Sequence, residues 1–184
     1  MRYQQRLNFI TLFIASILLC NCSKQTYLTG SMMHYLQEKN IELSRIQFYN
    51  DAKLDLEREV SASDASVTGG KVVLQNGQYI NRITLDELTP GLLTGQKNGH
   101  LLISFEQGVK NSKAFHFAPV VGEKGEYFYQ LVDEKGNSKY SRLEFEGLKY
   151  LVVHKKEKIR LMLAKEVIKE MKINNRKIKG NKIK

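Results

Sequence analysis

The sequence predicts a mainly β protein, a single antiparallel sandwich or barrel-like domain with a short N-terminal helix. Segments with apolar residues at every second position recur along the chain, and turns rich in Gly and Asn separate them. The 184 residues are 42% apolar, which is enough for one packed core. These observations together predict an all-β fold, with a further helix near the C-terminus as an open alternative.

Residues 1–21 are predicted to be a lipoprotein signal peptide. Two arginines precede an apolar run from Leu7 to Leu19, which is shorter than the roughly 20 residues that a membrane-spanning helix needs. Both cysteines of the chain, Cys20 and Cys22, follow directly after this run. A cleaved signal is therefore favoured over a transmembrane anchor.

The end of this segment resembles the lipobox of bacterial lipoproteins, in which a small residue precedes a cysteine that is diacylated on its sulfur. Cys22 is the expected lipidation site, because Asn21 is smaller and less hydrophobic than Leu19. Cys20 stays open as the alternative acceptor, as does an ordinary secretory signal. A metal or redox pair is disfavoured because the two cysteines lie inside the hydrophobic segment.

After the cysteine, residues 22–30 read as a polar tether and residues 31–172 as the β-rich domain. Ser31 is expected to cap a short helix over Met32–Lys39. From Ile41 to Phe48 the apolar period changes to two with a slip of one position, which predicts a strand with a bulge.

The strands that follow are predicted from alternation and from turn residues. Leu54–Val60 alternates as a half-buried strand, and Lys71–Leu85 predicts a hairpin around Asn76-Gly77, since both turn residues need positive φ. Thr89-Pro90-Gly91 is expected to interrupt the pattern, and Lys97-Asn98-Gly99 to form a further turn. Further strands are predicted at Leu101–Phe105, Lys113–Val120, Glu126–Asp133 (with Tyr127–Tyr129 buried on both sides), Lys139–Glu146 and Lys149–Val153.

The basic charge lies at the C-terminal end of the chain. Residues 154–184 hold twelve Lys or Arg against three acidic residues, whereas the whole chain has a net charge of +10. Helix and strand stay open for residues 159–172, with a strand near Ile159–Leu163 favoured, and residues 173–184 are expected to form a basic flexible tail. Such a tail is either a solvated end or a contact for anionic lipid, and export from the cytoplasm disfavours nucleic acid.

Sequence motifs give no support for catalysis, and the chain is predicted not to be an enzyme and to need no metal or cofactor. Phosphate-binding loops, dinucleotide fingerprints and zinc-protease motifs are missing from the sequence. The best remaining cluster is the strand face of His100, Ser104 and Glu106, with His116 from the next strand. This face supports an alternative function as an envelope hydrolase or a metal-binding protein. A solvated strand face is the simpler interpretation.

Several segments together resemble uncharacterised Bacteroidetes-type lipoproteins, namely the lipobox, Ile46–Tyr49, Leu54–Glu59, Gly70–Gly77, Thr89–Gly91 and Leu102–Glu106. The resemblance covers most of the mature chain and implies no activity. We therefore expect a lipid-anchored protein of the bacterial outer membrane that faces the periplasm and acts as a non-catalytic binding or structural module. A partner in the envelope would dock through an exposed sheet edge.

Overall fold

The computed structural model describes residues 24–61, 71–75, 77–106, 113–155 and 158–167. The fold is mainly β, with two antiparallel sheets and few helices, as the sequence predicts. The predicted signal peptide, both cysteines and the predicted basic tail lie outside the described residues.

The larger sheet has seven strands in the order β1-β12-β2-β6-β7-β8-β9, and all neighbours are antiparallel. Its strands are β1 (Gln25–Tyr27), β12 (Leu161–Ala164), β2 (Phe48–Asn50), β6 (Pro90–Lys97), β7 (His100–Ser104), β8 (Ala114–Val121) and β9 (Tyr127–Val132). The first and last strands of the described chain are thus neighbours in this sheet.

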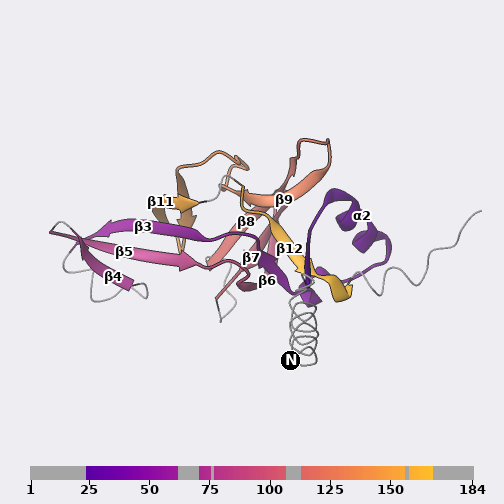
Figure 1. Ribbon diagram of the computed structural model, residues 1–184, viewed down its shortest axis with the longest axis horizontal. Coiled ribbons are helices and arrows are strands. Elements are labelled where there is room, and N and C mark those ends of the chain that lie inside the picture. The colour runs from indigo at the N-terminus through magenta and orange to yellow at the C-terminus, as the bar shows by residue number, and fades with distance from the viewer. Residues whose placement is uncertain (1–23, 62–70, 76, 107–112, 156–157, 168–184) are drawn as a thin grey trace, which may run out of the picture.

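The smaller sheet has five strands in the order β10-β11-β3-β5-β4. Its strands are β10 (Arg142–Phe145), β11 (Leu148–Lys155), β3 (Leu54–Val60), β5 (Gln78–Leu85) and β4 (Lys71–Gln75). Figure 1 shows β3, β5 and β4 extending away from the larger sheet as an arm, with helix α2 (Gly30–Glu38) at the opposite end of the molecule.

The larger sheet curls until its last strand meets its first two. The Leu28 N–H donates to Leu161 O at 2.8 Å, while Leu28 O accepts from the Tyr129 N–H at 3.0 Å. Further along, the Leu131 N–H donates to Ile159 O at 2.8 Å. The chain next to β1 and β12 therefore satisfies the backbone groups of β9, which gives the sheet its barrel-like closure.

The core fills this closed sheet and the start of the arm. Its largest fully buried side chains come from both sheets, from α2 and from the segment before it: Tyr150, Phe48, Phe117, Leu28, Leu36, Leu54, Leu56, Ile103, Ile159, Leu161, Leu163 and Val132. Along the arm the burial ends, because Leu74 is 64% exposed. The arm is thus rooted in the core at its base, with an apolar residue exposed near its tip.

The segment predicted to be a tether is different in the structure. Gln25–Tyr27 forms β1 and pairs with Met162–Ala164, and Leu28 is fully buried. The polar composition of this segment favoured a linker. Its main-chain hydrogen bonds to β12 and the buried side chain of Leu28 are enough to hold it as an edge strand.

The short helix is confirmed, with a different cap. The Thr29 hydroxyl, and not that of Ser31, accepts a hydrogen bond from the Met32 N–H at 3.2 Å. Asn40 has φ 53°, which ends the helix as predicted. The predicted strand from Ile41 to Phe48 is wrong, because Leu43–Arg45 forms the 3-10 turn η1 and β2 starts only at Phe48.

The predicted hairpins are confirmed by their registers. Gln75 pairs with Gln78 across Asn76-Gly77, and Lys97 pairs with His100 across Asn98-Gly99. Asn98 and Gly99 both have positive φ, as a tight two-residue hairpin turn requires.

Two predictions near the strand ends need correction. Pro90-Gly91 does not interrupt a strand but begins β6, where it pairs with β2. Tyr127–Tyr129 is not buried on both sides, since β9 is last in the sheet order and Tyr127 is 51% exposed.

The favoured strand near the C-terminus is confirmed as β12, and helical turns begin at residue 165.

Candidate functional site

The predicted cluster of His100, Ser104 and Glu106 does not form a catalytic arrangement. The Ser104 hydroxyl is buried and contacts the backbone of Glu106 at 3.3 and 3.4 Å. The Glu106 carboxylate pairs with Lys113 at 2.8 Å, and Lys113 also contacts Glu146 at 2.8 Å. Each of these side chains thus has its own partner, and among the described residues no hydrogen bond joins the serine hydroxyl to an imidazole that could act as a base.

His100 instead lies against His116, the fourth residue of the predicted face. Leu102 pairs with His116 across β7 and β8, and His100 is two positions before Leu102 on the same face. The two Nδ1 atoms are 3.2 Å apart, and the rings meet edge to face at 81°. One ring therefore donates a hydrogen bond to the other, which requires at least one neutral imidazole.

Two carboxylates line a cavity together with His116 of this pair. The cavity measures about 340 Å³ and is lined by Lys97, Leu102, Ala114, His116, Glu134, Glu144 and Gly147. Glu134 follows β9, whereas Glu144 lies on β10 of the other sheet. The cavity thus lies between the two sheets, and we call His100, His116, Glu134 and Glu144 the histidine–carboxylate cluster.

The loop that carries Glu134 is held in place by its own hydrogen bonds. Asp133 Oδ1 accepts from the N–H groups of Lys135 and Asn137 at 2.9 and 2.8 Å. Gly136 has φ 87°, and a Cβ at this position would lie 3.2 Å from His100 Nε2. Glycine at this turn therefore permits both the backbone conformation and the close approach of the histidine ring.

The surroundings of His116 and Glu144 disfavour the charged form of each side chain. Burial lowers the pKa of His116, and the neighbouring charges of His100 and Lys97 lower it further. A hydrogen bond with Glu134 raises the pKa of Glu144, and burial and the negative charge of Glu134 act in the same direction. The surroundings thus lower the pKa of His116 and raise that of Glu144, so the charged forms of both side chains are disfavoured.

The histidine pair has the spacing of two metal ligands but lacks a full ligand set. Two nitrogens on one tetrahedral zinc lie roughly 3.3 Å apart when each Zn–N bond is about 2.0 Å, and the observed separation is 3.2 Å. Within the described residues, no group of three or more His, Cys, Asp or Glu is placed to hold a metal ion.

Sequence reasoning found His100 and His116 but missed both carboxylates. Strand alternation places residues on a face only within one sheet, whereas Glu134 and Glu144 reach the histidines from a loop and from the second sheet.

A second feature of interest is the end of the larger sheet where β1 and β12 meet. Gln25 pairs with Ala164, and the Lys165 N–H donates to Lys24 O at 2.7 Å. We call Lys24–Tyr27 together with Met162–Lys165 the β1–β12 edge. It is the part of the described fold closest in sequence to the predicted lipidation site.

Comparison with known proteins finds no match for this chain. No protein-family model matches it, and no curated protein or solved structure matches it significantly. The resemblance to lipoproteins therefore stays a prediction from the sequence.

Proposed function

We propose that this chain is a lipid-anchored, non-catalytic binding or structural module of the bacterial envelope, held at the outer membrane and facing the periplasm. The observation that carries this proposal is the apolar run Leu7–Leu19 followed directly by Cys20 and Cys22, and the short separation between Cys22 and the first strand adds where the anchor would hold the fold. β1 begins at Gln25, and its backbone is paired with β12 from that residue onward.

This separation determines how an acylated cysteine would hold the domain. An extended chain covers at most about 3.6 Å per residue, so Cys22 and Gln25 are within roughly 11 Å of each other. Two acyl chains on one cysteine give stable membrane attachment, unlike a single chain. A protein acylated at Cys22 would therefore rest directly on the bilayer, with no long linker between lipid and fold.

The membrane attachment in this proposal depends on the lipid. Among the described residues, no helix has the length and apolar character needed to cross a bilayer. The non-catalytic part of the proposal is supported by the separate partners of His100, Ser104 and Glu106.

Lipid labelling of cysteine variants in the bacterial cell tests the proposal. Cys22→Ala is expected to abolish incorporation of labelled fatty acid and to release the protein from the membrane fraction. Cys20→Ala is the matched control, with the same chemical change two positions earlier, and should keep both properties. Labelling that survives in the Cys22→Ala variant and disappears in the Cys20→Ala variant would assign the anchor to the other cysteine, and labelling of neither wild type nor variant would overturn the proposal.

A metal-binding function is the second candidate, and the 3.2 Å separation of His100 Nδ1 and His116 Nδ1 favours it. Two imidazoles leave half of a tetrahedral shell to water, which is fewer protein ligands than zinc sites normally have. Under our main proposal the purified protein contains no stoichiometric zinc by elemental analysis. Tightly held zinc that is lost in the His116→Ala variant would instead establish the metal-binding function.

A further inference from the structure

A cavity lies where the larger sheet closes, on the face turned away from the core. It measures about 190 Å³, the volume of roughly six water molecules. Since Leu131 belongs to the core, alternation along β9 places Phe128 and Gln130 on the opposite face, where they line this cavity. Lys158 and Arg160, just before β12, line it from the neighbouring segment. We call this space the Arg160 cavity.

The backbone of Arg160 is held on both sides. Its N–H donates to Asp51 Oδ1 at 2.7 Å, and its carbonyl oxygen accepts from the Asp51 N–H at 3.1 Å. Gln130 and Arg160 also form an antiparallel bridge. Side chains at directly paired positions leave the sheet on one face, with their Cβ atoms about 4.5–5.5 Å apart. The side chains of Arg160 and Gln130 therefore start from neighbouring points on the cavity wall.

Two aromatic rings hold the Arg160 guanidinium. Its central carbon lies 5.0 Å from the centre of the Phe128 ring and 5.1 Å from the centre of the Tyr27 ring. These contacts attract the cation but use none of its N–H groups in hydrogen bonds to an acceptor oxygen. Among the described residues, no carboxylate forms an ion pair with the Arg160 guanidinium. Its N–H groups are therefore available to a ligand in the cavity.

Phe128 is itself held in place by the turn between β8 and β9. The Gly122 N–H donates to Glu126 O at 2.7 Å, and the Gly125 N–H donates to Gly122 O at 3.0 Å. A Cβ at position 122 would lie 2.8 Å from Phe128 Cε2. Glycine there permits the turn to pack closely on the ring, which fixes the surface on which the guanidinium rests.

Gln130 brings a second polar group to the cavity. The residue is only 6% exposed. In the part of the chain that the structure describes, its side-chain amide makes no hydrogen bond, although buried amides are normally paired. The amide therefore needs a partner that enters the cavity, and its NH2 group can donate to an anion held by Arg160.

The acidic side chains of the cavity wall leave Arg160 accessible. Glu126 accepts a hydrogen bond from the Ser31 hydroxyl at 3.3 Å. The Glu123 side chain is 92% exposed, and its nearest cation is Lys158 at 3.9 Å. The wall holds three cationic side chains against two acidic ones, a net charge of +1: Lys124, Lys158 and Arg160 against Glu123 and Glu126.

We propose that the Arg160 cavity binds a small monocarboxylate with an apolar body. The carboxylate accepts hydrogen bonds from the Arg160 guanidinium and the Gln130 amide, and the apolar body lies against Val120 and Phe128, which line the same space. The inference goes beyond the proposed function, since binding in this cavity does not depend on acylation of Cys22.

Shape and charge favour a carboxylate over other anions. The planar fork of an arginine matches the two oxygens of a carboxylate, which gives a pair of parallel hydrogen bonds. A net charge of +1, with two carboxylates already in the wall, complements a monoanion better than the dianion of phosphate. The apolar wall of Val120 and Phe128 favours a ligand with an apolar body over acetate.

Equilibrium dialysis with radiolabelled benzoate tests the inference on the full chain purified in detergent. Protein-free micelles measure the benzoate that enters the detergent. We expect saturable binding with a Kd of about 1 mM or lower, from the affinity that each non-hydrogen atom of a small ligand contributes. Benzamide, which has the same shape without the charge, and inorganic phosphate are expected to compete at least about tenfold more weakly.

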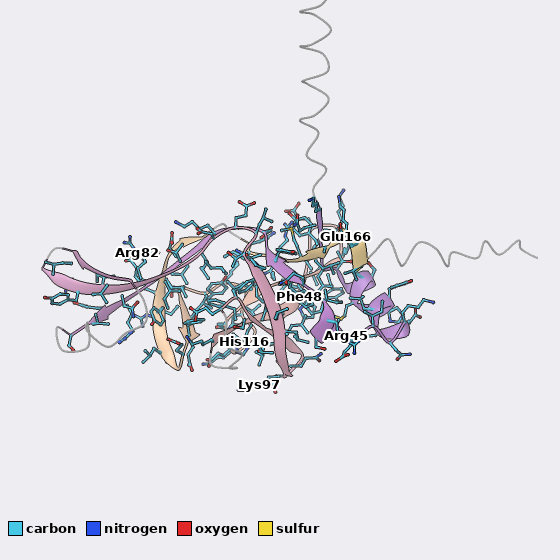
Figure 2. All side chains as sticks on the ribbon, turned by 90° about the horizontal axis from the view of Figure 1, so that it is seen from below. Arg45, Phe48, Arg82, Lys97, His116 and Glu166 are labelled. Atoms are coloured by element: carbon cyan, nitrogen blue, oxygen red, sulfur yellow. The ribbon has the colours of Figure 1, made fainter. Side chains whose placement is uncertain are left out.

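The decisive comparison is between two arginine variants that remove the same charge. Arg160→Gln is expected to weaken benzoate binding by at least about tenfold, because a charge-assisted pair of hydrogen bonds is lost. Arg82→Gln is the matched control on the arm, where Figure 2 shows Arg82 far along β5. It should change the Kd by less than about twofold, since a charge beyond the screening distance has little effect.

Two further variants separate recognition from loss of structure. Arg160→Lys keeps the charge but not the fork, and Gln130→Leu keeps the bulk but not the amide; each should weaken binding by about threefold or more. Circular dichroism checks that every variant is folded, and the competition by benzamide and phosphate needs no variant.

Three results would overturn the inference. They are the lack of saturable benzoate binding, equal weakening by Arg160→Gln and Arg82→Gln, and competition by benzamide or phosphate as strong as that by benzoate itself. All three leave the anchor proposal standing, because lipid labelling at Cys22 succeeds or fails in its own experiment.

Discussion

The β1–β12 edge and the histidine–carboxylate cluster are built from different interactions. The edge is held by backbone hydrogen bonds and by apolar side chains, with Leu28 and Leu163 fully buried behind it. In the cluster, His116, Glu134 and Glu144 line a cavity of about 340 Å³ between the two sheets, and His100 lies against His116. One region is therefore stabilised by burial, and the other has a charge state that changes with pH.

This difference suggests a division of roles within one small domain. Apolar burial and main-chain pairing depend little on pH, so the β1–β12 edge should keep its shape as the pH changes. In the cavity, burial lowers the pKa of His116, and the contact with Glu134 raises that of Glu144, so charge in this region works against stability. The predictions below test whether the two regions differ in this way.

The largest effect is expected at Leu28, which connects β12 and β9 by its backbone and fills the core with its side chain. Leu28→Ala should lower the free energy of unfolding by about 2–5 kcal/mol, because it leaves a cavity at a fully buried position. Denaturant unfolding should show this loss equally at pH 5 and pH 7.5, since no charge is removed.

Leu74→Ala is the matched control on the arm. The same truncation at a side chain that is 64% exposed should cost less than about 0.5 kcal/mol. A loss at Leu28 no greater than at Leu74 would mean that the chain next to β1 is not part of the cooperative fold, and the tether predicted from the sequence would then be the better description.

A smaller, pH-dependent effect is expected at His116. Burial lowers the pKa of His116 below its ordinary value of 6.5, so the unfolded chain binds this proton more readily than the folded chain. Stability is therefore lost as the pH falls through 6.5 toward the lowered pKa. Lys97 and His100 strengthen this trend, whereas the negative charges of Glu144 and Asp133 oppose it.

Thermal unfolding from pH 8 to pH 5 measures this contribution. His116→Gln should flatten the decline in melting temperature at the acidic end while keeping a polar side chain in the cavity. An unchanged pH profile would show that other groups cause the acid sensitivity.

The smallest effect is expected at Glu144. Its pKa is raised above the ordinary 4.5 by the hydrogen bond with Glu134, so the folded chain holds the proton more tightly than the unfolded one. Stability therefore falls as the pH rises through 4.5 toward the raised pKa, and Glu144→Gln should be stabilising at pH 7. The gain should be a few tenths of a kcal/mol, because solvent screens this pair. A destabilised Glu144→Gln variant would contradict the proposed repulsion.

Local features of the fold were predictable where one or two residues determine the backbone. Asn98 and Gly99 both have positive φ, a conformation that few other residues adopt readily. The core side of β3 was also readable, because Leu54, Leu56 and Val60 are buried as their spacing predicts, whereas Asp55 on the predicted outer face is buried against expectation. These signals gave the fold class and most strands.

Pairing between distant segments was not predictable from local patterns. Gln25–Tyr27 is polar and became a strand only because β12 lies beside it. The spacing of apolar residues from Ile41 to Phe48 predicted a bulged strand. The shift of one position in that spacing is caused instead by the 3-10 turn at Leu43–Arg45. Half of the candidate site was hidden for this reason, since Glu144 meets His116 only through the packing of two sheets.

Under the proposed anchor at Cys22, the β1–β12 edge lies toward the membrane because β1 begins at Gln25, and the histidine–carboxylate cluster lies away from it, since Figure 2 shows Glu166 and His116 on different sides of the molecule. The mature chain predicted here has Cys22 as its only cysteine, which acylation would occupy, so a single cysteine can be introduced and labelled. Fluorophores at Lys165→Cys and, separately, at Lys135→Cys of the lipid-anchored protein are exposed to a quencher attached to lipid headgroups. The account predicts strong quenching at position 165 and little at position 135. Equal quenching at both positions, or stronger quenching at 135, would contradict it.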